Sequence, residues 1–149
     1  MKKLFTFILL LLATAFSIQA QQAKYVFYFI GDGMGTNQVL GTEMYLSELR
    51  GEIGVTPLLF TQFPYSTVAT TFSATNGVTD SAAAGTALAT GYKTKNGAIG
   101  VKKDQTTIVS SVAEWAKAHG ARVGISSSVA IDHATPAAIY AHQADRGNR

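Results

Sequence analysis

The sequence predicts an α/β fold with a mostly parallel sheet, because stretches typical of buried strands alternate with stretches of helical periodicity. Residues 25–30 are an uncharged run of aromatic and β-branched residues, which is typical of a strand buried on both faces. Residues 66–72 are rich in Thr, and residues 122–126 alternate apolar residues, so both are expected to be strands. A helical pattern follows each of these three segments.

Two of the expected helices are recognised by their apolar spacing and by the glycine that ends them. Residues 37–50 carry apolar residues on one side, and Gly51 follows them. Residues 107–119 show the same spacing and are followed by Gly120. A strand, a loop and a helix therefore form the first unit of the predicted fold.

The pair Asp80-Ser81 stands directly before an Ala-rich stretch that is expected to be helical and to end at Gly91. The first turn of a helix has N–H groups without intrahelical partners and the positive end of the dipole, so an anion is stabilised there. A serine hydroxyl in that position is a candidate nucleophile. The alternative is that Asp80 or Ser81 serves only as an N-cap.

A helix is also expected over residues 137–146, because Thr135-Pro136 is a typical helix start. This helix would place His142 and Arg146 on one face, four residues apart. Arg146 near its C-terminus could serve only to compensate the helix dipole.

The N-terminal residues 1–20 have the layout of a secretory signal, with Lys2 and Lys3, an apolar stretch and a small residue at Ala20. We expect its removal and export of the chain to the periplasm or the extracellular space, because the apolar stretch is shorter than the roughly 20 residues of a membrane span. No stable membrane span is expected afterwards.

Composition limits the possible partners and metal ligands. The net charge of +3 falls to +1 without Lys2 and Lys3, and there is no long basic run, so no nucleic-acid partner is expected. The chain has no Cys, so disulfides and thiolate metal sites are excluded and any metal must use oxygen and imidazole ligands. Residues 21–149 are sufficient for one modest domain.

Oxygen ligands follow the predicted strands, at the edge of a parallel sheet where ligands gather. Asp32 lies between glycines in Gly-Asp-Gly-Met-Gly, a spacing that differs from the dinucleotide fingerprint, and its carboxylate would repel phosphate. A cation, either magnesium or zinc, is the better explanation, and a tight turn with Asp as a helix cap is the alternative. His133 and Thr135 follow the third strand, and each could also be only a cap residue.

Three motifs together resemble the alkaline phosphatase family. Residues 29–35 read Phe-Ile-Gly-Asp-Gly-Met-Gly, residues 78–87 read Val-Thr-Asp-Ser-Ala-Ala-Ala-Gly-Thr-Ala, and residues 133–138 read His-Ala-Thr-Pro-Ala-Ala, followed by Arg146. The resemblance runs from about residue 24 to the end of the chain and implies the N-terminal part of that family's three-layer α/β/α sandwich. Family members normally continue for several hundred residues, so we expect this chain to be an incomplete catalytic domain.

The resemblance also implies site roles and cofactors. Asp32 would bridge one of two zinc ions and a magnesium ion, Ser81 would be the nucleophile that becomes phosphorylated, and Thr135 would contribute to the magnesium site. Arg146 would hold the phosphate of a monoester substrate. His133 matches a position where members have either Asp or His, so the resemblance leaves the metal preference open. Its imidazole would favour zinc over magnesium.

The family's other zinc ligands and a magnesium-binding Glu lie later in its members, and intact members are commonly homodimers. We therefore expect the 149-residue chain alone to bind zinc poorly and to hydrolyse little phosphate monoester. The alternatives are a related metal-dependent phosphodiesterase or sulfatase and a non-catalytic exported phosphate-binding module. A serine hydrolase is disfavoured because Ser81 has no Gly-x-Ser-x-Gly elbow around it.

Overall fold

The computed structural model describes residues 23–148, and the chain divides into two compact units, Met1–Gly31 and Asp32–Arg149. The expected signal segment, residues 1–20, lies outside the described residues. Within the described part of the chain, no helix is long and apolar enough to cross a membrane.

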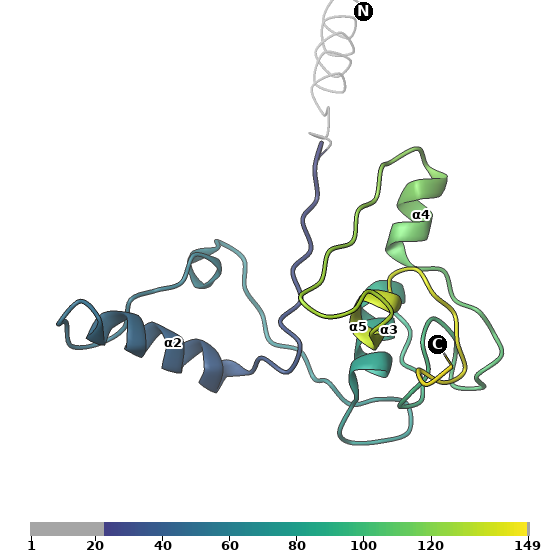
Figure 1. Cartoon of the computed structure of the whole chain (residues 1–149), viewed down its shortest axis with the longest axis horizontal. Helices are drawn as coiled ribbons and strands as arrows, with labels where there is room; N and C mark the ends of the chain where they lie inside the picture. Colours follow the sequence, from purple (N-terminus) through teal and green to yellow (C-terminus); the bar gives the residue numbers. More distant parts are fainter. Residues whose placement is uncertain (1–22, 149) are drawn as a thin grey trace, which may run out of the picture. The chain divides into compact units, whose positions relative to one another are not determined.

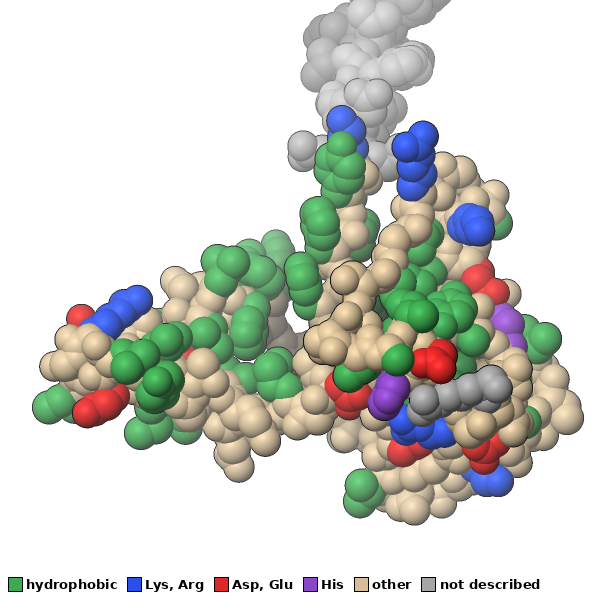
Figure 2. Space-filling view, in the orientation of Figure 1, with side chains coloured by type: hydrophobic (Ala, Val, Ile, Leu, Met, Phe, Trp, Pro, Cys, Tyr) green, Lys and Arg blue, Asp and Glu red, His purple; other side chains and the backbone are tan. Residues whose placement is uncertain are grey.

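In the first unit, residues 23–31 are extended. The rings of Phe27 and Phe29 are stacked with their centroids 6.5 Å apart, because alternate side chains of an extended chain lie on the same face. The expected burial is wrong for this segment, since Phe27 is 78% exposed and Phe29 is 87% exposed. A strand becomes buried when other strands and helices pack against it. Within the described residues, no strand pairs with residues 25–30, so most of their side chains stay exposed. Hydrophobic side chains are also widespread at the surface shown in Figure 2.

The second unit begins with helix α2, Thr36–Glu48, and the short 3-10 helix η1, Phe60–Gln62. α2 confirms the helix expected over residues 37–50. The Glu43 carboxylate on α2 accepts hydrogen bonds from the backbone N–H of Leu58 at 2.9 Å and from the hydroxyl of Thr61 at 2.6 Å. These bonds fix η1 to α2.

Helix α3, Ser81–Thr90, begins and ends where the sequence predicts. Asp80 is the N-cap, and its side chain accepts a hydrogen bond from the backbone N–H of Ala83 at 3.0 Å. Gly91 ends the helix with a left-handed φ of 78°, which glycine adopts without a steric cost.

Helix α4, Val112–Ala118, is shorter than the helix expected over residues 107–119. Ser111 and Glu114 form a capping box, in which each side chain accepts a hydrogen bond from the other residue's backbone N–H. This cap sets the start of α4 after Ser111.

The helix expected over residues 137–146 is wrong, because α5 covers only Ala134–Ala137. The backbone beyond it bonds to another segment instead of continuing as a helix. Gln143 and Ile99 form an antiparallel bridge, and the N–H of Arg146 donates to the carbonyl of Gly97 at 2.7 Å. His142 and Arg146 therefore do not share a helix face.

The expected strands at residues 66–72 and 122–126 carry no β-ladder. Across residues 23–148 the β-pairs are isolated antiparallel bridges, Ile99↔Gln143 and Val101↔Ile108. The mostly parallel sheet therefore stays a prediction.

The core of the second unit includes small residues on α3 and α5, which lie side by side (Figure 1). A Cβ added at Gly85 of α3 would lie 2.9 Å from the Cβ of Ala138, just after α5, so glycine permits the close approach of the two helices. The buried cluster is formed by Ala82, Ile99, Ala134, Ala137 and Ala138. This packing holds the start of α5 beside α3.

Candidate active site

Three of the predicted site residues come together around one carboxylate. The hydroxyl of Ser81 donates to Oδ1 of Asp32 at 3.2 Å, and the hydroxyl of Thr135 donates to Oδ2 of the same residue at 2.7 Å. These residues are separated by 49 and 103 positions in the sequence, so the cluster is a product of the fold. Each carboxylate oxygen is thus paired with one hydroxyl.

Ser81 owes its position to the N-terminus of α3. It is the first residue of that helix, directly after the Asp80 cap, and it is half-buried, whereas Asp32 is exposed. Its Oγ is therefore held beside the free N–H groups of the first helical turn, which stabilise negative charge.

Thr135 does not cap α5, although threonine is a preferred N-cap residue. His133 is the N-cap, with extended backbone angles and no side-chain cap hydrogen bond, and Thr135 lies inside the first turn. Because its hydroxyl is not used as a cap, it is available to donate to Asp32. The structure places His133 at the start of α5, two residues before Thr135.

Arg146 lies at the start of α3 through a contact that the sequence did not predict. Its Nη1 is 3.5 Å from Oδ2 of Asp80, and both side chains are about one-third exposed or less. The same carboxylate oxygen accepts the N–H of Gly97 at 3.0 Å, and the carbonyl of Gly97 accepts the N–H of Arg146 at 2.7 Å. Asp80 thus caps the helix of Ser81 and also binds the arginine. The signal in the sequence that could have indicated this contact is the dipeptide Asn96-Gly97, which is typical of a turn.

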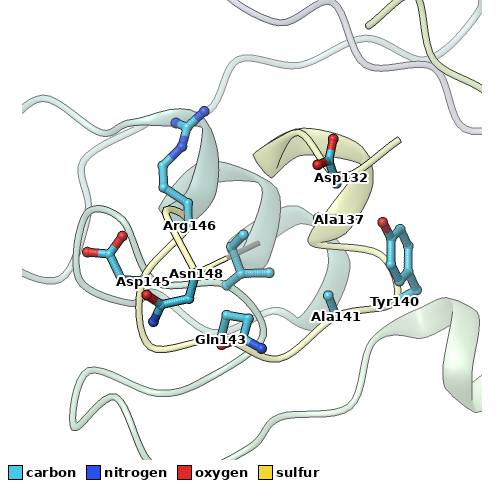
Figure 3. A pocket seen from close by; sticks show the side chains of 9 residues that line it. Asp132, Ala137, Tyr140, Ala141, Gln143, Asp145, Arg146 and Asn148 are labelled. Atoms are coloured by element: carbon cyan, nitrogen blue, oxygen red, sulfur yellow. The ribbon is translucent and has the colours of Figure 1, made fainter. Parts of the chain in front are cut away.

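An open pocket of about 160 Å³ lies beside Arg146 (Figure 3). Arg146 and Asn148 project from the C-terminal segment, and Asp132 projects from the turn before α5. Asp32, Ser81 and Thr135 are not among its lining residues, and of the described residues that line it, Arg146 is the one that belongs to the candidate site. The lining consists of Ile99, Asp132, Ala137, Tyr140, Ala141, Gln143, Asp145, Arg146 and Asn148.

The donor atoms at Asp32 are suited to a hard cation. A carboxylate and two hydroxyls offer oxygen ligands, which magnesium prefers. Over residues 23–148, no three His, Asp or Glu side chains cluster so that they could hold a metal. The described part of the chain therefore supplies a partial oxygen site and no nitrogen-rich zinc site.

The comparison with family models matches residues 23–149 to the alkaline phosphatase model. The chain belongs to the alkaline phosphatase family. It is 39% identical over 134 residues to alkaline phosphatase 4 of Drosophila melanogaster, covering 85% of this chain and 22% of that protein. It is 37% identical to the human tissue-nonspecific isozyme, covering 83% of this chain and 26% of the isozyme.

Solved structures agree with this assignment. The cold-active alkaline phosphatase of Shewanella sp. superposes with a TM-score of 0.72 at 36% identity, over 80% of this chain and 30% of that enzyme. The alkaline phosphatase of the Antarctic bacterium TAB5 superposes with a TM-score of 0.65 at 39% identity, over 79% and 32% of the two chains. A variant of the TAB5 enzyme holds Mg in its M3 site. The chain thus spans between about a fifth and a third of the relatives it matches and follows their fold over that part.

Proposed function

We propose that this chain contributes the nucleophile and the phosphate-binding group of a phosphate monoester hydrolase that reacts through a phosphoserine intermediate. The observation that supports it most strongly is the convergence of Ser81 and Thr135 on the Asp32 carboxylate. The family membership of residues 23–149 supports the same reaction class.

In the proposed reaction, Ser81 Oγ attacks the phosphorus atom of the monoester. The new Oγ–P bond forms as the bond from phosphorus to the alcohol oxygen breaks, and the proton that Oγ loses is balanced by the one that the leaving alcohol takes up. Water later hydrolyses the phosphoserine. The Ser81 hydroxyl donates its hydrogen bond to Asp32, which directs the O–H toward the carboxylate and leaves the lone pairs of Oγ free to face the phosphorus atom. The N-terminus of α3 stabilises the charge that develops on the phosphoryl oxygens.

Arg146 is the proposed phosphate clamp. Its guanidinium can donate to two nonbridging phosphate oxygens at once, which offsets charge in a transition state that depends mainly on positioning and electrostatics. The ion pair with Asp80 brings this guanidinium to the residue before the nucleophile. The ion pair supports a shared site for Arg146 and Ser81.

The donor set fits the proposed magnesium site, which Asp32 and Thr135 would help to hold, and Asp32 and Ser81 would also help to hold a zinc ion. When bound, these cations would increase the nucleophilicity of the hydroxyl and stabilise the leaving oxygen. His133 would add an imidazole ligand near Thr135. Because the described residues form no cluster of three His, Asp or Glu, we infer that sustained turnover needs ligands beyond them.

A zinc and magnesium titration with a chromogenic monoester tests the proposal. We expect slow phosphorylation of the 149-residue chain and little sustained turnover, with no reaction of the matching phosphodiester or sulfate ester. Preference for the diester or the sulfate ester would overturn the monoester assignment. Equilibrium phosphate binding without any serine phosphorylation would favour a non-catalytic phosphate-binding module.

Export and homodimer formation by the complete protein belong to the same proposal. Export is supported by the signal-like residues 1–20. Cell fractionation tests export, and analytical ultracentrifugation tests the oligomeric state.

A further inference from the structure

The segment that ends in Arg146 has no regular secondary structure, so other contacts must fix it. We call residues 141–146 the arginine arm. Its backbone pairs with Ile99 through Gln143 and with Gly97 through Arg146. His142 lies between α5 and Gln143 in the sequence, and its side chain is 21% exposed.

Both ring nitrogens of His142 face hydrogen-bond acceptors. Nδ1 is 2.7 Å from the carbonyl oxygen of Gly100, and Nε2 is 2.9 Å from Oε1 of Glu114 on α4. A neutral imidazole has one N–H and can donate to only one of them, whereas an imidazolium donates to both. The geometry therefore selects the charged form of the ring.

We propose that the imidazolium of His142 is a positioning residue, which fastens the arginine arm to the 97–101 loop and to α4 and releases it as the pH rises. This inference rests on the proposed role of Arg146 in binding phosphate. His142 itself touches neither the nucleophile nor the substrate position.

The contact with Gly100 connects the arm to the helix of the nucleophile. The N–H of Gly100 donates to the hydroxyl of Thr86 on α3 at 3.0 Å, and Thr86 is fully buried. Gly100 has a φ of +60°, and a Cβ there would collide with the carbonyl oxygen of Ala141 and lie 2.5 Å from Nδ1 of His142. Only glycine allows this close approach of the loop to Ala141 and His142.

The contact with Glu114 is equally constrained. Oε2 of Glu114 accepts the N–H of Ser111 at 2.7 Å in the capping box, which leaves Oε1 for His142. The hydroxyl of Ser111 also donates to the carbonyl of Ile139 at 2.6 Å, just before the arm. The start of α4 thus holds both the chain entering the arm and its histidine.

The charges around His142 favour protonation. Burial disfavours the charged ring, but the hydrogen bonds to Glu114 and Gly100 and the charge of Glu114 outweigh it, so the pKa of His142 is raised above its usual 6.5. Burial also disfavours the Glu114 carboxylate, yet its bonds to Ser111 and His142 lower the pKa of that group below 4.5. While Glu114 stays ionised, the fastening is therefore complete below about pH 6.5, and it is lost as the pH rises through the raised pKa of His142.

Several other ionisable side chains near His142 have contacts of their own, among them Asp145 of the arm, whose Oδ1 accepts the N–H of Gly147 at 2.7 Å. Lys102 lies over the ring of Tyr92, and His119 of α4 stacks on Trp115. The hydroxyl of Tyr140 donates to the carbonyl of Ile131. In α3, Ser81–Thr90 contains no Asp, Glu, Lys, Arg or His, so it adds no charge beside His142.

The variant Glu114→Gln separates a positioning role from a purely structural one. A glutamine keeps the capping box, because its amide oxygen accepts the N–H of Ser111. Its amide nitrogen donates to Nε2 of His142, so a neutral ring donating from Nδ1 to Gly100 satisfies every contact. We expect the pKa of His142 to fall to its usual value or below, and the arm to keep its contacts as the pH rises above that value, where the wild type loses them.

The experiment uses NMR on the full chain at a series of pH values. It follows the imidazole titration of His142 and the protection of the backbone amides of Gln143 and Arg146 against hydrogen exchange. In the wild type, protection should drop about tenfold with the midpoint of the His142 titration, as expected for loss of one charge-assisted hydrogen bond. His119→Gln, the control at the C-cap of α4, should behave as the wild type. An ordinary or lowered His142 pKa, or arm protection independent of that titration, would overturn the proposal.

Inorganic phosphate binding, measured over the same pH range, tests the proposed function separately. Wild-type affinity should weaken relative to Glu114→Gln as His142 loses its proton, and the comparison cancels the titration of phosphate itself. If the wild type binds no phosphate, the role of Arg146 is wrong, and the titration and exchange data still decide whether His142 positions the arm. Equal affinities across the pH range would contradict the link between His142 and Arg146.

Discussion

Replacing Gly85 by alanine tests the packing that holds the start of α5 against α3. The new Cβ would lie 2.9 Å from the Cβ of Ala138 and 3.6 Å from the Cα of Thr135. Neither atom is the end of a flexible side chain, so the backbone of α5 must move. Thr135 would move with it, away from the Asp32 carboxylate that its hydroxyl contacts.

Two opposing contributions set the magnitude of the Gly85→Ala effect. Overpacking of a tight core costs about 1–3 kcal/mol, and the helix gains about 0.5–1 kcal/mol when alanine replaces glycine in its interior. We therefore expect a net destabilisation on the order of 1 kcal/mol. Gly41 of α2 is the matched control, since a Cβ there meets nothing within 4 Å. Gly41→Ala should stabilise the protein by about 0.5–1 kcal/mol.

Urea unfolding followed by far-UV circular dichroism gives both free energies of unfolding. The two variants should move in opposite directions from the wild type. If Gly85→Ala is as stable as Gly41→Ala, then α3 and α5 do not pack as described, and the placement of Thr135 beside Asp32 is also wrong.

Substitutions at three further positions test the candidate site. Asp80→Ala and Asp80→Ser both lose the contacts of Oδ2 with Gly97 and Arg146, but only Asp80→Ala also loses the α3 cap. Asp80→Ser should therefore be more stable than Asp80→Ala by about 1 kcal/mol in urea titrations, because serine caps as well as aspartate. Equal stability of the two variants would refute the contribution of the cap. Thr135→Val, which removes the hydroxyl on Asp32, should weaken magnesium binding about tenfold by calorimetry, while Thr135→Ser should not. His133→Asp should raise the affinity for magnesium relative to zinc in the same assay, and an unchanged ratio would exclude His133 from the metal site.

Local signals predicted the helices whose ends are set by neighbouring residues. α3 was predicted in full because the Asp80 cap and Gly91 both act within one turn. The helix expected after Thr135-Pro136 failed because the chain beyond α5 bonds to the 97–101 loop, and such long-range pairing overrides local propensity.

The candidate site was predictable only where its residues lie in motifs. Asp32, Ser81 and Thr135 were each singled out from their motifs, but their meeting depends on separations of 49 and 103 residues, which no local pattern encodes. The ion pair between Asp80 and Arg146 was missed, because it depends on how the turn at Gly97 directs the C-terminal segment.

The proposed role of Ser81 is tested most directly by acid-quenching the chain after incubation with a phosphate monoester, zinc and magnesium, and by locating any added phosphoryl group by peptide mass spectrometry. This measurement needs only the phosphorylation step, so it works even if the phosphoserine is hydrolysed slowly. We predict a single phosphoryl group on Ser81, absent from Ser81→Ala and reduced in Arg146→Ala. An unlabelled chain that still binds phosphate, or labelling that persists in Ser81→Ala, would contradict the assignment of Ser81 as the nucleophile.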